Sequence, residues 1–430
     1  MSKIDQKLIY NLLCSTDILK YLNICDKTEL SSSCKYIYEK CSIIRLENFK
    51  FGLMELLEYN YITQKEHYWG HEKYKFKPEY FNTIINKHKD RLLCLTYSVR
   101  DYFIIEYFSL KFTNLKSLCL DYIILPKTTL KGIIKNLPNL RTLLLCGIIA
   151  GYSKNDIQVA DFKFSKHLKE LTWINCTQFE LDSTDYLSIN QHGFGSDFEN
   201  ENTLDLSLNS VNTLEYLDWQ RLNDDNIQLF NETIFNNPRL TNLKADLICL
   251  NSNSFNLISR SPNLTKLTIS MYGESVELDS SILCKLPNIK TLELYTTLEN
   301  VLDSIDLLVS SCPNLEELKL PYYEEFEHNI NDILKNFANL KILSINVYSV
   351  FPSTLGSILP ESNLEKLEIY SIDPLKFDFN TFINMKKLKY INNTHKDYNY
   401  NEYDEISEYE NLKGWRVISY PESTQYWKTK

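Results

Sequence analysis

A six-position pattern of apolar residues, L-x-x-L-x-L, recurs along most of this 430-residue chain. Residues 315–320 carry it, and apolar residues at Ile305, Leu308, Val309 and Cys312 come before them. The i, i+3, i+4, i+7 spacing predicts a helix with one buried face, which the next residue, a proline, ends. The L-x-x-L-x-L segment predicts a short strand. Because one helix and one strand cannot bury their apolar faces alone, this unit needs copies of itself on both sides.

Copies of the unit occur at regular intervals along the chain. The full pattern begins again at Leu115, Leu140, Leu264, Ile289, Leu340 and Leu364, and looser versions begin at Leu92, Leu168, Leu214, Leu240 and Leu388. From Leu214 onward the first positions (214, 240, 264, 289, 315, 340, 364, 388) are 24 to 26 residues apart. Leucine-rich repeats have roughly 20–29 residues. We therefore predict an α/β leucine-rich-repeat solenoid, a horseshoe with a parallel sheet on its concave face and helices outside.

Overall charge and hydropathy limit the classes of partner. The net charge is −10 and the pI about 5.4, which argues against a nucleic-acid partner, since binding phosphates needs a basic surface. The N-terminus has no long apolar region, and the most apolar stretch, 143–150, is far shorter than the roughly 20 residues that span a bilayer. We expect a soluble protein of the cytoplasm or nucleus, without a membrane partner.

Residues with catalytic or metal-binding chemistry do not form a recognisable motif. The 11 cysteines are scattered without a C-x-x-C, which predicts free thiols rather than disulfides in an intracellular protein. There is no Gly-rich phosphate loop and no G-x-S-x-G. His67 and His71 are four residues apart, but no third metal ligand is apparent. The sequence predicts no catalytic residues, no cofactor and no metal, and hence a protein that is not an enzyme.

The first 48 residues do not follow the repeat. Their apolar spacing predicts three short helices, with Asp26 and Thr28 as caps between the second and third. One interpretation is a bundle that covers the open end of the solenoid, because an uncovered end would expose the continuous core. The order I-L-K-Y-L (18–22), a short polar link and L-S-S-S-C-K (30–35) also resembles the F-box family.

This resemblance implies an adaptor-binding function for the N-terminal helices. In the F-box family they dock an apolar ridge onto a Skp-type adaptor of a cullin ubiquitin ligase. By resemblance, the ridge and its core would be Ile18, Leu19, Leu22, Leu30 and Cys34. The family usually opens with Leu-Pro, which the segment 9–13 lacks. The C-P-N-L phrase at 312–315 is similar to the turns of F-box proteins with leucine-rich repeats.

The sequence divides into four regions. They are 1–48, an F-box-like helical domain; 49–90, a helical, aromatic bridge and N-terminal cap; 91–394, about 12 repeats with an irregular insertion near 180–205; and 395–430, an acidic, aromatic C-terminal cap or tail. The ninth repeat position is often Asn or Cys in such repeats, and here Cys176 alone conforms. We expect the backbone hydrogen bonds that a ninth-position Asn would support to be formed by other groups.

Function is predicted to reside on the concave face, where the x residues of the strands point. These residues are Tyr216, Asp218, Lys244, Lys266, Thr268, Glu293, Tyr295, Glu317, Lys319, Ser344, Lys366, Glu368 and Tyr370, with Tyr322 just beyond a strand. Charged residues interleaved with tyrosines are typical of a protein-binding surface. The sequence therefore predicts a substrate-recognition subunit of a cullin (SCF) ubiquitin ligase with an unknown protein substrate. The alternative is a non-catalytic scaffold without ligase contact.

Overall fold

The computed structural model describes the chain in two compact units, Met1–Leu214 and Glu215–Lys430, and each is treated separately here. The described residues are 48–52, 81–99, 101–153, 162–181, 202–206, 211–220, 227–271, 278, 280–296, 302–322, 339–347, 363–371, 382, 385–395, 414–420 and 423–429. The expected F-box-like segment, the histidines at 67 and 71 and most of the expected insertion lie outside these residues.

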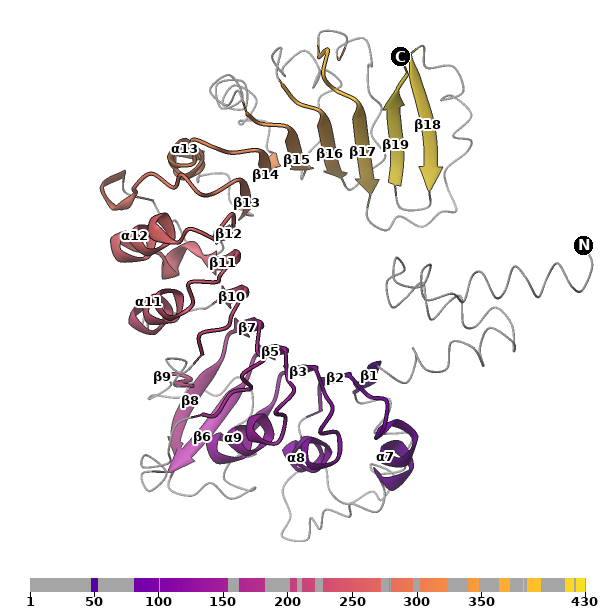
Figure 1. The fold of residues 1–430 in the computed structure, drawn as a ribbon, viewed down its shortest axis with the longest axis vertical. Coiled ribbons are helices and arrows are strands. Elements are labelled where there is room, and N and C mark those ends of the chain that lie inside the picture. Colours follow the sequence, from indigo (N-terminus) through magenta and orange to yellow (C-terminus); the bar gives the residue numbers. More distant parts are fainter. Residues whose placement is uncertain are drawn as a thin grey trace, which may run out of the picture. The chain divides into compact units, whose positions relative to one another are not determined.

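The N-terminal unit contains a parallel sheet in the order β1-β2-β3-β5-β7. Its strands are β1 (Asn48–Phe51), β2 (Cys94–Tyr97), β3 (Ser117–Asp121), β5 (Thr142–Cys146) and β7 (Glu170–Ile174). Three helices lie on one side of this sheet, α7 (Asn82–His88), α8 (Tyr102–Lys111) and α9 (Lys127–Lys135) (Figure 1). The buried residues Ile84 and Ile85 of α7 follow the helical spacing expected for the end of the bridge.

The C-terminal unit contains the parallel strands β10 to β17, paired in chain order. They are β10 (Tyr216–Gln220), β11 (Asn242–Asp246), β12 (Lys266–Met271), β13 (Thr291–Thr296), β14 (Glu317–Tyr322), β15 (Ile342–Val347), β16 (Lys366–Ser371) and β17 (Tyr390–His395). The described helices are α11 (Ile227–Asn236), α12 (Ser252–Arg260), α13 (Leu302–Ser311) and the 3-10 turns η4 (Leu247–Cys249) and η5 (Ser280–Ile282). In Figure 1, α11 to α13 lie on one side of the strands.

The buried core is the one that the repeat predicts. In α13 the side chains of Ile305, Leu308 and Val309 are fully buried, and so are Leu315 and Leu318 of the following strand segment. In β3, β5 and β13 buried and half-buried residues alternate, because successive side chains point to opposite faces. Burying each large aliphatic side chain contributes about 1.5–3 kcal/mol. The fold is a leucine-rich-repeat solenoid, as predicted.

The asparagine of the P-N-L turn links each repeat to the one before it. Asn263 Nδ2 donates to the carbonyl oxygen of Pro238, and Asn314 Nδ2 donates to that of Pro287, both at 2.9 Å. Asn288 Nδ2 instead donates to the carbonyl of Ser261, one residue before the corresponding proline, at 3.2 Å. These carbonyls lie where the chain passes from helix to strand, so they have no partner within a helix. The phrase that carried the family resemblance therefore has a structural function in this chain.

A second ladder runs along the second repeat position, where charges alternate in sign. The ammonium of Lys290 lies 3.0 Å and that of Lys341 lies 2.9 Å from the Glu316 carboxylate, and Lys389 lies 2.6 Å from Glu365. Hydrogen bonds from these lysines lower the pKa values of Glu316 and Glu365. Because the pairs are exposed, they contribute more to the register of the repeats than to stability.

The eighth repeat position differs between the two units. In the N-terminal unit Tyr122, Gly147 and Asn175 occupy it with left-handed backbones, at φ of 53°, 60° and 50°. Their turns lead into a second sheet of β4 (Ile124–Pro126), β6 (Ile149–Ser153), β8 (Thr177–Leu181) and β9 (Asn202–Thr203). In the C-terminal unit, β12 to β16 instead continue through the eighth position.

Left-handed turns also explain how the N-terminal unit manages without a ninth-position asparagine. The backbone N–H of Tyr122 donates to the carbonyl of Cys146, and the N–H of Gly147 donates to that of Ile174, both at 2.8 Å. Each bond crosses to the next repeat. Cys176, which does conform to the usual pattern, donates from Sγ to the carbonyl of Leu145 at 3.3 Å.

An antiparallel hairpin closes the C-terminal unit. Its strands are β18 (Trp415–Tyr420) and β19 (Ser423–Lys428), and β19 pairs with β17. Tyr426 on β19 is 1% exposed and extends the core past the last repeat. The sequence predicted a cap or tail here without strands, because neither segment carries the repeat pattern. β1 was missed in the bridge for the same reason.

Replacing Gly147 by alanine should destabilise the protein by about 1–2 kcal/mol, the cost of a left-handed backbone for a residue with a Cβ. The new Cβ would also lie 2.7 Å from Cδ1 of Tyr122. Gly132→Ala is the matched control, since Gly132 lies within α9 with no heavy atom within 4 Å of its Cβ direction. That change should stabilise by about 0.5–1 kcal/mol. Urea unfolding measures both, and equal effects would contradict the assignment of strain to position eight.

Replacing Asn314 by alanine should cost about 1 kcal/mol of unfolding free energy, because the Pro287 carbonyl loses its donor. Asn314→Asp keeps the shape of the side chain but removes the donor, so it should destabilise at least as much. The measurement is again urea unfolding. A loss below about 0.3 kcal/mol in both variants, within the scatter of ordinary surface substitutions, would show that the inter-repeat bond contributes nothing.

Candidate functional site

The candidate site is the face of the C-terminal strands opposite the described helices, called here the helix-free face. It consists of the third, fifth and seventh repeat positions of β10 to β17. Because the parallel strands are paired in register, residues at equal positions stand side by side about 4.8 Å apart. Thus Thr268, Glu293, Lys319, Ser344 and Glu368 form one continuous row across five strands. This row contains five of the residues that the sequence predicted for the concave face.

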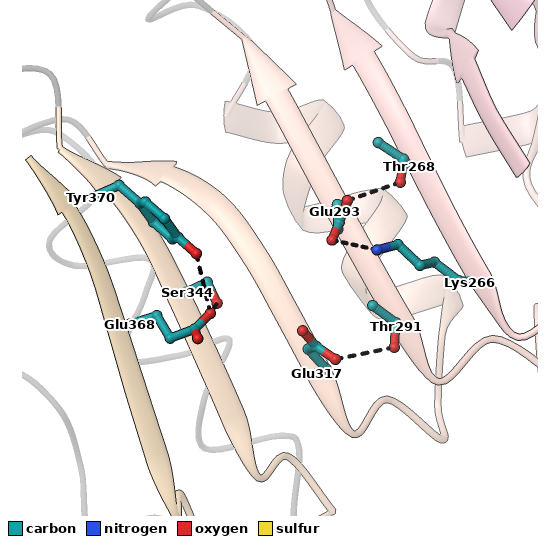
Figure 2. A network of polar contacts seen from close by, with 8 residues as sticks. All are labelled: Lys266, Thr268, Thr291, Glu293, Glu317, Ser344, Glu368 and Tyr370. Atoms are coloured by element: carbon teal, nitrogen blue, oxygen red, sulfur yellow. Dashed lines mark hydrogen bonds and ion pairs between the residues drawn. The ribbon is translucent and has the colours of Figure 1, made fainter. Parts of the chain in front are cut away.

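Hydrogen bonds join neighbouring strands across this row (Figure 2). Lys266 Nζ lies 2.7 Å from Glu293 Oε1, and Thr268 Oγ1 donates to Oε2 of the same carboxylate at 3.1 Å. Thr291 Oγ1 donates to Glu317 Oε2 at 3.4 Å. Each carboxylate is therefore held by a donor on the preceding strand, which fixes the direction of its side chain.

Glu368 is the most strongly held of these carboxylates. Partial burial alone would raise its pKa, but hydrogen bonds from Lys366 (2.6 Å) and Ser344 (2.8 Å) outweigh this effect and lower the pKa below its usual value. A carboxyl group with a lowered pKa stabilises the folded state at neutral pH, and that contribution is lost as the pH falls through the lowered pKa. Glu368 is thus a fixed negative charge under ordinary conditions.

Lys319 lies at the centre of the face between two tyrosine rings. Its Nζ is 4.2 Å from the ring centroid of Tyr370 and 5.4 Å from that of Tyr295. Tyr370 is on β16 and Lys319 on β14, so the Tyr370 ring passes over β15 and covers Ser344, which is 1% exposed. The Tyr370 hydroxyl donates to Glu368 Oε2 at 3.4 Å. We call Tyr295, Lys319, Glu368 and Tyr370 the Lys319 cluster.

The arrangement of the Lys319 cluster favours contact with a protein. Cation–π pairs fix both tyrosines while leaving them half-exposed, and rigid tyrosines give large contact areas with little loss of conformational entropy on binding. Burial, followed by the nearby Glu368 carboxylate, raises the pKa of Tyr370 to about 12. The phenol therefore stays protonated and acts as a hydrogen-bond donor.

The first residues of the predicted face form a separate polar group. Asp218 is almost fully buried, and its carboxylate lies 3.1 Å from Lys244 Nζ and accepts a 2.8 Å bond from Gln220 Nε2. The Tyr216 hydroxyl lies 3.5 Å from the same carboxylate. Asp218 serves to order this group, and Tyr216 and Lys244 are its half-exposed members.

The placement of Tyr322 on the binding face was wrong. Its side chain is fully buried. We expected the strand to end at Leu320, but β14 continues to Tyr322. Since side chains alternate along a strand, residue 322 points to the same side as Leu318 and Leu320, into the core. The preceding Pro321 takes the helix-free position instead.

The equivalent positions of the N-terminal unit are chemically different. They carry small or uncharged side chains for the most part, namely Asn48, Lys50, Cys94, Thr96, Ser117, Cys119, Asp121, Thr142, Leu144, Cys146, Glu170, Thr172 and Ile174. A surface of this kind offers few charges and no aromatic rings. The aromatic and charged residues suited to recognition are therefore concentrated in the C-terminal unit.

The described residues include seven cysteines, all of which are free thiols. Burial raises the pKa of Cys119 to about 11 and that of Cys312 to about 12, so neither is a thiolate at neutral pH. No cluster of three or more metal-ligating side chains occurs in the described part of the chain. None of the described helices has the length and apolar character needed to cross a membrane. The five predicted adaptor-binding residues lie before residue 48, outside the described segments.

Comparisons with known proteins give distant structural matches and no sequence match. No protein-family profile matches the chain, and no curated protein matches it. Among solved structures, the TLR13–ssRNA13 complex is 16% identical, with a TM-score of 0.42, and the match covers 73% of this chain and 41% of that one. This chain thus spans less than half of the TLR13 chain.

Two further structures match over most of their length. A leucine-rich-repeat protein of Leptospira interrogans is 13% identical, with a TM-score of 0.31 and coverage of 81% of this chain and 89% of that one. The Rad7–Elc1 complex of yeast is 14% identical, with a TM-score of 0.30 and coverage of 88% and 96%. Since all three TM-scores are below 0.5, the fold assignment rests on the repeat geometry of this chain.

Proposed function

We propose that this chain is a non-catalytic recognition protein that binds a partner protein through the helix-free face of its C-terminal unit. The single observation that carries the proposal is the Lys319 cluster. Two tyrosines from strands three places apart are held against the ammonium of Lys319. The stability of a solvated sheet face does not require aromatic rings that are held in fixed positions, so a binding function explains them better.

Charge pairing supports a protein rather than a strongly charged ligand. Lys244, Lys266 and Lys366 each have a carboxylate within 3.1 Å, and the face has no large excess of either sign. A polyanion such as nucleic acid would have to break these pairs. A protein surface can instead complement them pair by pair while burying the tyrosines.

The finer part of the proposal concerns residues 1–48. By their resemblance to the F-box, we propose that they bind a Skp-type adaptor, which would make the chain a substrate-recognition subunit of a cullin ubiquitin ligase. The chain would then act by proximity, raising the effective concentration of its partner near the ligase. The second candidate, a scaffold without ligase contact, is supported by the absence of the family's opening Leu-Pro from segment 9–13.

Deleting residues 1–47, which leaves β1 (Asn48–Phe51) complete, should abolish binding to a purified Skp-type adaptor while leaving the repeats folded. Calorimetric titration with the full chain and with the deletion variant measures binding, and circular dichroism checks the fold. In the full chain, Leu19→Asp combined with Leu22→Asp should give the same loss. A folded full chain that does not bind the adaptor would leave the scaffold function.

Changing the Lys319 cluster should remove partner proteins without affecting the adaptor. Tyr370→Ala should cost about 2 kcal/mol of binding energy, roughly 30-fold, if Tyr370 is a central contact. Quantitative mass spectrometry of proteins crosslinked to the full chain in its host measures the loss. Tyr122→Ala is the matched control, because Tyr122 is 62% exposed in the N-terminal unit. The same set of crosslinked proteins in both variants would contradict a binding function for this face.

A further inference from the structure

A row of aromatic and cationic side chains crosses from the last parallel strands onto the C-terminal hairpin. Lys366 on β16, Tyr390 on β17, Trp427 on β19 and Arg416 on β18 are successive register partners. Register partners share one face of a sheet, so all four stand on the helix-free face. We call them the aromatic row. Sequence analysis placed none of the last three on this face.

The aromatic row presents an indole that is supported on one side only. The rings of Tyr390 and Trp427 lie 4.3 Å apart between centroids, and Lys366 Nζ lies 5.6 Å from the Tyr390 ring. Trp427 nevertheless remains 44% exposed, and its neighbour Arg416 is exposed as well. Tryptophan, tyrosine and arginine are the residue types most enriched among the dominant contacts of protein interfaces.

Positive charge at this end of the face is not balanced as it is elsewhere. Lys366 is paired with Glu368, but Arg416 forms no ion pair with any carboxylate in the described segments. On the helix-free face of β16 to β19 the described charged residues are Lys366, Glu368 and Arg416, which leaves one cation without a carboxylate partner among them. Because this cation, Arg416, lies next to the exposed indole, the row favours a ligand that carries a carboxylate.

We propose that the aromatic row binds an acidic peptide segment of a partner protein. An aromatic or aliphatic side chain of the segment lies on the exposed face of Trp427, and an adjacent carboxylate accepts hydrogen bonds from the Arg416 guanidinium. This inference rests on the proposed function and adds to it the chemistry of the partner. The Lys319 cluster contributes the charge-balanced part of the interface and the aromatic row its anionic anchor.

A peptide fits the surroundings of the row better than a nucleic acid does. Glu368 lies beside Lys366, and Glu317 and Glu293 follow on the same face. A chain of phosphates extending across the face would meet these carboxylates, whereas a peptide needs to place only one or two anions next to Arg416. An oligonucleotide is therefore the appropriate competing ligand in the test.

Fluorescence anisotropy with the full chain tests the proposal. The probe is a labelled 12-residue peptide with the repeat Glu-Glu-Phe, compared with the same peptide carrying Lys-Lys-Phe and with a labelled oligothymidine of 12 nucleotides. We expect the acidic peptide to bind most tightly and with strong salt dependence. Arg416→Glu should weaken its binding at least tenfold, and Trp427→Ala should do the same.

Matched variants separate recognition from folding. Arg239→Glu makes the same charge change at an exposed arginine after α11 and should leave the affinity unchanged. Trp427→Phe keeps a ring against Tyr390 and should lose less affinity than Trp427→Ala. If Trp427→Ala unfolds the hairpin, the affinity of the Arg416→Glu variant for the acidic peptide tests the proposal by itself.

Three results would overturn the proposal. The first is equal binding of the acidic and basic peptides, and the second is tighter binding of the oligonucleotide. The third is peptide binding that appears only after Glu402, Asp404, Glu405 and Glu408 are changed to the corresponding amides, which would assign the row to the chain's own acidic stretch. In each case the Tyr370→Ala experiment still decides independently whether the face binds a protein.

Discussion

Each parallel strand of this protein depends on its neighbours for backbone hydrogen bonds. A strand in one repeat is complete only when the next repeat presents its strand in register, since every unpaired N–H or carbonyl that is buried is costly. The regular spacing of 24 to 26 residues between first positions reflects this requirement, because it brings each strand back into register with the one before it. Asn263 and Asn314 at the turns, and Lys290, Glu316 and Lys341 at the second positions, hold the same register outside the sheet.

Register also creates the candidate binding surface. Leu318 and Leu343 are register partners in the core. Because side chains alternate along a strand, Lys319 and Ser344 are then aligned on the opposite face, and rows of side chains form there. The charges in these rows neutralise one another between adjacent strands, as Lys266 and Glu293 do. Under the proposed function, the shape of the tyrosines and the positions of the charge pairs would select a partner more than net charge would. Only at the hairpin does this balance end.

Much of the fold could be predicted from the sequence because the repeat is local. The buried helix residues Leu130, Ile133 and Ile134 follow from spacing alone, and so do the strand leucines and most of the face. The pairing of β19 with β17 could not be predicted in this way. It joins residues about 35 positions apart in the antiparallel sense, and nothing in the pattern near Trp427 indicates it.

The candidate site was predicted in part for related reasons. Positions three, five and seven of a strand follow from alternation, which placed Lys319 and Tyr370 correctly on one face. Where a strand ends depends on tertiary contacts, so Tyr322 was assigned to the wrong side. That Tyr370 reaches across β15 to Lys319 depends on side-chain conformation, which the repeat pattern does not contain.

The two ways of using the eighth repeat position mean that the repeats of this protein are not interchangeable. A consensus repeat written from the C-terminal unit would carry a core side chain such as Met271, Tyr322 or Val347 at that position. Inserted into the N-terminal unit, it would place this apolar side chain at a left-handed turn, where Tyr122 is 62% exposed, so the side chain would be lost from the core. A β-branched residue such as Val347 would also resist the left-handed backbone. Repeat engineering in this scaffold therefore needs two consensus sequences. Duplication of single repeats during its evolution would have been tolerated only within each half.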